Sequence, residues 1–71
     1  MTRHITVTPA TPGWAIHIEG EAVPVAFASG ARAEATARAI AGGFADAGVD
    51  AELQVFLRDG ALAGRFIARA A

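Results

Sequence analysis

The side chains best suited to chemistry in this 71-residue chain are two histidines, His4 and His17, and a group formed by Phe56, Arg58 and Arg65. An imidazole can bind a metal ion or exchange a proton near neutral pH. An aromatic ring flanked by arginines can stack on a base of single-stranded nucleic acid. Which of these chemistries is available depends on the elements that hold the side chains.

The segment from Leu53 to Phe66 predicts a β-hairpin, because the pair Asp59-Gly60 separates two runs in which side chains alternate between two faces. A two-residue loop places Arg58 opposite Ala61 and sets the register of both strands. The predicted pairs on the core face are Leu57/Leu62, Val55/Gly64 and Leu53/Phe66, and those on the other face are Phe56/Ala63, Gln54/Arg65 and Glu52/Ile67.

The predicted outer face of this hairpin carries Phe56, Arg58, Arg65 and Ile67, and one helix cannot cover both faces of a sheet. Exposed apolar patches on small proteins mark interfaces. We therefore expect these four residues to form an interface, with a homodimer made through the open sheet face or an edge strand as the leading hypothesis. The identity of any other protein partner stays open.

The alternative hypothesis is a single-stranded nucleic-acid-binding module that uses Phe56, Arg58 and Arg65. Such platforms combine two or three stacked aromatic rings with an excess of basic residues. This chain has a formal net charge of −1 and one aromatic residue on that face. Composition therefore disfavours nucleic acid as the main partner.

Three strands and a helix are predicted ahead of the hairpin. Alternation predicts strands at His4–Thr8 and Trp14–Glu19, and the stripe of Val23, Val25 and Phe27 predicts a short edge strand because it includes a proline. Ser29 is suited to cap a helix that ends near Gly48, or near Ala41 if the pair Gly42-Gly43 stops it. The sequence therefore predicts one α+β domain over residues 1–71, an antiparallel sheet (three strands, a helix, two strands) with the single helix packed on one face.

The two histidines are predicted on the polar face of the first hairpin. If the apolar residues of both strands share the core face, His4 lies opposite either His17 or Glu19. Two histidines are too few for a zinc site, which Glu19 or a second subunit would have to complete, so we expect no metal and no cofactor. With no cysteine or lysine nucleophile, and with Ser29 explained as a cap, we also expect no enzymatic activity.

The composition indicates a soluble protein with a small core. Apolar residues make up 54% of the chain, but half of them are alanine. A domain of this size and side-chain volume gains from the extra burial of a dimer. Cysteine is absent, no apolar run reaches the roughly 20 residues of a membrane span, and the N-terminus lacks a signal-peptide pattern. We therefore expect a cytoplasmic protein without a membrane partner.

Several short motifs occur in a recognisable order along most of the chain. They are Gly13-Trp14, Glu19-Gly20, Phe27, Ala37-Arg38 and Arg58-Asp59-Gly60. In this order they resemble a small bacterial family, domain of unknown function 2188, although the usual lysines are missing and the segment from Gly42 to Asp50 is longer. The resemblance implies a bacterial protein with the fold above, and it carries over no catalytic or binding residue.

Overall fold

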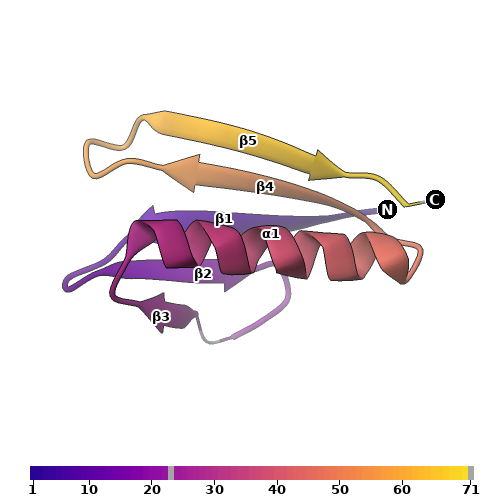
Figure 1. Ribbon diagram of the computed structural model, residues 1–71, viewed down its shortest axis with the longest axis horizontal. Helices are drawn as coiled ribbons and strands as arrows, with labels where there is room; N and C mark the ends of the chain where they lie inside the picture. Colours follow the sequence, from indigo (N-terminus) through magenta and orange to yellow (C-terminus); the bar gives the residue numbers. More distant parts are fainter. Residues whose placement is uncertain (23, 71) are drawn as a thin grey trace.

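Five strands form one sheet, and a single helix lies across one face of it, in the computed structural model, which describes residues 1–22 and 24–70 (Figure 1). The elements are β1 (Thr2–Pro9), β2 (Trp14–Ile18), β3 (Val25–Phe27), α1 (Gly30–Asp46), β4 (Asp50–Phe56) and β5 (Leu62–Ala68). The predicted α+β class with one helix is confirmed. Val23, predicted to belong to the third strand, lies outside the described residues.

The sheet is mixed, so the prediction of an antiparallel sheet is wrong for one pair of strands. The spatial order is β3-β2-β1-β4-β5, which differs from the order along the chain, and β1 pairs with β4 in parallel. The other three pairs are antiparallel. Three strands of alternating direction leave β3 parallel to β1, and α1 returns the chain to the end of the sheet where β1 begins (Figure 1). β4 therefore runs in the direction of β1 and pairs with it.

The core lies between α1 and the central strands. Its largest fully buried side chains are Ile5, Val7, Ile16 and Leu53. The helix contributes a stripe of small buried residues, namely Ala33, Ala37 and Ala41. Alanine lets the helix approach the sheet closely but adds little apolar volume, so the core is thin.

Residues next to its two ends determine where α1 begins and ends. The Ser29 hydroxyl accepts a hydrogen bond from the Arg32 backbone N–H at 3.3 Å, which confirms the predicted N-cap. The helix continues through Gly42-Gly43 and ends before Gly48, whose φ of +89° is left-handed. Termination near Ala41 is therefore wrong. Phe44 packs against the core, and this contact offsets the low helix propensity of the two glycines.

The hairpin loop that Leu57 and Ala61 close has three residues, Arg58, Asp59 and Gly60, so the predicted two-residue loop is wrong. The Leu57 N–H donates to the Ala61 carbonyl at 2.8 Å, and the Gly60 N–H donates to the Leu57 carbonyl at 2.9 Å. Gly60 has a φ of +89°, whereas no non-glycine residue has a positive φ among those described. A two-residue type I′ loop needs positive φ at both central positions. In the longer loop Asp59 does not adopt a positive φ. Its carboxylate accepts a hydrogen bond from the Ala61 N–H at 2.9 Å.

A β-bulge in β5 compensates for the longer loop. Phe56 pairs with Leu62 rather than Ala63, and a register shift separates this pair from Val55/Gly64. Ala63 is the extra residue, and beyond it the predicted register is restored. The predicted pairs that the structure confirms are Val55/Gly64, Gln54/Arg65, Leu53/Phe66 and Glu52/Ile67.

Candidate interaction surface

The face of the sheet opposite α1, called the open face below, is formed by the residues that alternate with the core residues along each strand. Its members in the four longest strands are Thr2, His4, Thr6 and Thr8 from β1, Ala15 and His17 from β2, Asp50, Glu52, Gln54 and Phe56 from β4, and Leu62, Arg65 and Ile67 from β5. The centre of this face is polar. Its large apolar side chains lie on β5 and at the end of β4.

The large apolar side chains of this face are called the β5 patch below: Phe56 and Leu62, which lie opposite each other, and Ile67, with Arg65 between Leu62 and Ile67. Leu62 and Ile67 are 51% and 41% exposed, and Phe56 is half-buried opposite Leu62. The alternation of the sequence correctly placed Phe56 and Ile67 on this face. It assigned Leu62 to the core face. That assignment is wrong, because the bulge at Ala63 shifts the alternation by one residue and places Leu62 on the open face.

Arg65 joins the open face and is held there by an acidic partner. Its Nε donates to the Glu52 carboxylate at 2.8 Å, and Gln54 Nε2 donates to the same carboxylate oxygen at 3.4 Å. Arg65 lies opposite Gln54 and diagonal to Glu52, as predicted. The pair neutralises the positive charge of Arg65 beside the β5 patch.

Arg58 does not join Phe56, Arg65 and Ile67, because it is directed to the turn between β1 and β2. Its guanidinium donates to the carbonyls of Ala10 and Gly13, each at 3.1 Å, and lies 5.2 Å from the centre of the Trp14 ring. The parallel pairing of β1 and β4 brings the ends of these two strands together, so the loops that follow them are neighbours. Arg58 therefore ties one loop to the other.

The histidines lie on the open face without facing each other. Ile5 pairs with Ile18, so His4 lies opposite Glu19, whose N–H donates to the His4 carbonyl at 2.9 Å, and His17 lies opposite Thr6. The register that opposes the two histidines is therefore wrong. Among residues 1–22 and 24–70, no group of three or more histidine and acidic side chains is placed to hold a metal ion.

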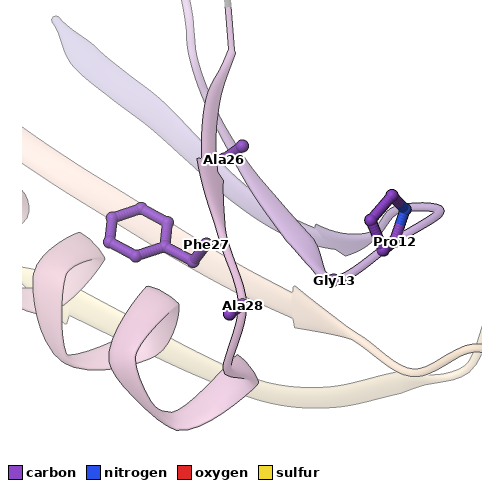
Figure 2. A pocket seen from close by; sticks show the side chains of 5 residues that line it. All are labelled: Pro12, Gly13, Ala26, Phe27 and Ala28. Carbon is purple, nitrogen blue, oxygen red and sulfur yellow. The ribbon is translucent and has the colours of Figure 1, made fainter.

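A shallow hollow of about 340 Å³ lies between the β1–β2 turn and β3, and Figure 2 shows the residues that line it, namely Pro12, Gly13, Ala26, Phe27 and Ala28. The Phe27 ring is directed towards α1, away from Pro12 (Figure 2). A Cβ on Gly13 would lie 2.2 Å from the Phe27 carbonyl oxygen, so only glycine fits this close approach. The lining side chains carry no acid, base or nucleophile, so the hollow offers contacts but no chemistry.

The two edges of the sheet differ in length. β3 forms one edge with three residues, and β5 forms the other with seven. An edge strand presents unpaired backbone N–H and C=O groups to solvent. β5 thus combines a long edge with two side chains of the β5 patch, Leu62 and Ile67.

No family model, curated protein or solved structure matches this chain. Within the described residues, no helix has both the length and the apolar character that a membrane crossing requires. The geometry of the open face and of β5 is therefore the main guide to function.

Proposed function

We propose that the chain is a small interaction module without enzymatic activity, and that it self-associates as a homodimer through the β5 side of the sheet. The observation that carries this proposal is the exposure of Leu62 and Ile67 on a seven-residue edge strand. A long edge with apolar side chains is a template for pairing with another chain. The resemblance to a bacterial family and a cytoplasmic location are consistent with this role and remain expectations.

The thin core supports self-association. Within residues 1–22 and 24–70, four large side chains are fully buried, and the buried stripe of α1 is alanine. In a 71-residue chain, the free energy gained by burial exceeds the conformational entropy of folding by a small margin. A partner that binds the folded chain but not the unfolded chain raises the stability of the folded chain by mass action.

The β5 side is a better candidate than the centre of the open face. The central strand β1 presents Thr2, Thr6 and Thr8 there, with His4 among them, and these side chains are well solvated when exposed. Covering them requires new hydrogen bonds from a partner. Covering Leu62 and Ile67 removes apolar surface from water and needs no such partner groups.

Nucleic-acid binding has less support. Arg58 donates to two backbone carbonyls, and Arg65 is paired with Glu52. A phosphate group would have to compete with these partners, and Phe56 is the single aromatic residue of the platform. The net charge of −1 adds no long-range attraction for a polyanion.

Sedimentation equilibrium of the intact chain and two variants tests the proposal. Ile67→Asp places a charge within the β5 patch and is expected to weaken the dimer at least about tenfold, because an unpaired charge is costly to bury. Val25→Asp is the matched control: Val25 is 48% exposed but lies on β3, at the opposite edge. Its dimer affinity is expected to be unchanged.

Two results would contradict the proposal. The first is a monomer at high micromolar concentration for the unmodified chain. The second is an equal loss of affinity in both variants, which would place the interface away from the β5 side. Circular dichroism of each variant establishes that the fold is retained before the affinities are compared.

A further inference from the structure

We infer that two copies of the chain pair antiparallel along β5 with Phe66 of one copy opposite Phe66 of the other, an inference that rests on the proposed self-association and specifies its geometry. A symmetric antiparallel pair has a two-fold axis perpendicular to the sheet. The axis passes through one central position of β5, so the register is defined by a single residue. Two independent features of the strand select Phe66.

The first feature is the bulge. β5 pairs regularly with β4 from Gly64 to Ala68, and the irregularity at Ala63 ends this segment. A bulge disrupts the backbone ladder and bends the strand, so pairing on the outer edge is most favourable along the regular segment. Phe66 is the middle of these five residues, and a centre there pairs all five. A centre at Gly64 or Ala68 keeps only the central residue paired within the regular segment, because the other four residues then lie opposite residues beyond it.

The second feature is the position of the arginines. A centre at Arg65 places this residue opposite itself, and a centre at Ile67 places Arg65 opposite Arg69 of the second copy. Like charges directly opposite each other destabilise a strand pair. A centre at Phe66 places Arg65 opposite Ile67, so the aliphatic part of the arginine covers the exposed isoleucine while its guanidinium keeps its bond to Glu52.

The same register brings apolar groups together on the helix side. Phe66 points to that side and packs partly against the core, with the Arg38 guanidinium 4.8 Å from the centre of its ring. Arg38 is itself neutralised by Glu34 at 3.1 Å. Two Phe66 rings on neighbouring strands gain a cross-strand aromatic contact, and each ring keeps its contact with Arg38 of its own copy. The two-fold axis leaves both helices on one side of a continuous ten-stranded sheet.

Disulfide trapping tests the register, because the chain has no cysteine of its own. The variants are Arg65→Cys and Ile67→Cys, oxidised separately and as an equimolar mixture. Directly opposed residues in an antiparallel pair have Cα atoms about 4.5–5.5 Å apart, which a disulfide spans. The mixture is expected to form the mixed disulfide at least about tenfold faster than either variant forms its own, because the opposed thiols share one complex. Val25→Cys reports the rate of random collision.

Each outcome has a defined meaning. Predominance of the mixed disulfide supports the register centred on Phe66. If Arg65→Cys or Ile67→Cys alone rapidly forms a disulfide between two copies of the same variant, the two-fold axis lies at that residue and the inference is overturned. A dimer in sedimentation whose variants form no disulfide faster than Val25→Cys also overturns it. A monomer in sedimentation for the unmodified chain overturns the proposed self-association itself, and the two failures are therefore distinguishable.

Discussion

Both faces of the β4–β5 hairpin carry large apolar residues, but the faces differ in what covers them. On the helix side, Leu53 is 1% exposed beneath α1. On the open face, Phe56 is half-buried and its cross-strand neighbour Leu62 is exposed. The difference shows that alternation assigns a side chain to a face, whereas the packing of a second layer decides whether burial there stabilises the fold. Folding should therefore depend on one face and association on the other.

Removing a large side chain from each face should give the largest difference between the two faces, measured as the free energy of unfolding. Leu53→Ala is expected to lower the free energy of unfolding by about 3 kcal/mol, because it opens a cavity in a thin core. Phe56→Ala is expected to lower it by about 1 kcal/mol, since part of the ring is already in contact with water. Urea denaturation at a protein concentration below the dimer dissociation constant measures both effects without a contribution from association.

Equal losses in the two variants would contradict the distinction between the faces. A matched control is Val55→Ala, which lies on the helix side of the same strand and is half-buried. Its loss is expected to fall between the other two, because a smaller side chain is removed from a partly covered site.

The hairpin illustrates what local sequence predicts well. Apolar alternation and the Asp59-Gly60 pair were sufficient for the register from Glu52 to Val55. They were insufficient for the loop, because a two-residue and a three-residue loop both place a glycine at positive φ. The choice depends on whether Asp59 adopts positive φ as well, and residue spacing does not report that energy.

The position of Arg58 illustrates what local sequence cannot predict. Alternation extends the open face to this residue, but its hydrogen-bond acceptors, the carbonyls of Ala10 and Gly13, lie more than forty residues away in the chain. They are neighbours because β4 pairs with β1 in parallel. That pairing depends on which edge of the first three strands β4 joins, and the sequence leaves this choice open. Of the four residues expected at an interface, Phe56, Arg65 and Ile67 therefore lie on the open face, and Arg58 does not.

The two arginines predicted on the open face, of which Arg65 lies there and Arg58 does not, test the comparison through smaller effects. Arg58→Ala is expected to lower the free energy of unfolding by about 1–2 kcal/mol, because it removes two charge-assisted hydrogen bonds and a cation–π contact with Trp14. Thermal denaturation at low protein concentration measures the change. Arg58→Lys keeps the charge but cannot reach both carbonyls with one fork, so it should recover less than half of the loss. Full recovery by lysine would mean that charge alone matters at this position.

Arg65→Ala is expected to change the stability of the monomer by less than about 1 kcal/mol, because the Arg65 side chain of the ion pair with Glu52 is 54% exposed to solvent. The same substitution should weaken the dimer, since the aliphatic part of Arg65 is proposed to cover Ile67 of the second copy. Arg65→Met separates the two contributions: it removes the charge and retains an apolar chain of similar length. Sedimentation is expected to show a dimer of Arg65→Met that is tighter than that of Arg65→Ala, while urea denaturation shows monomers of equal stability. Dimers of equal affinity in both variants would mean that Arg65 contributes no apolar contact, and the distinction between a face for folding and a side for association would then rest on Leu62 and Ile67 alone.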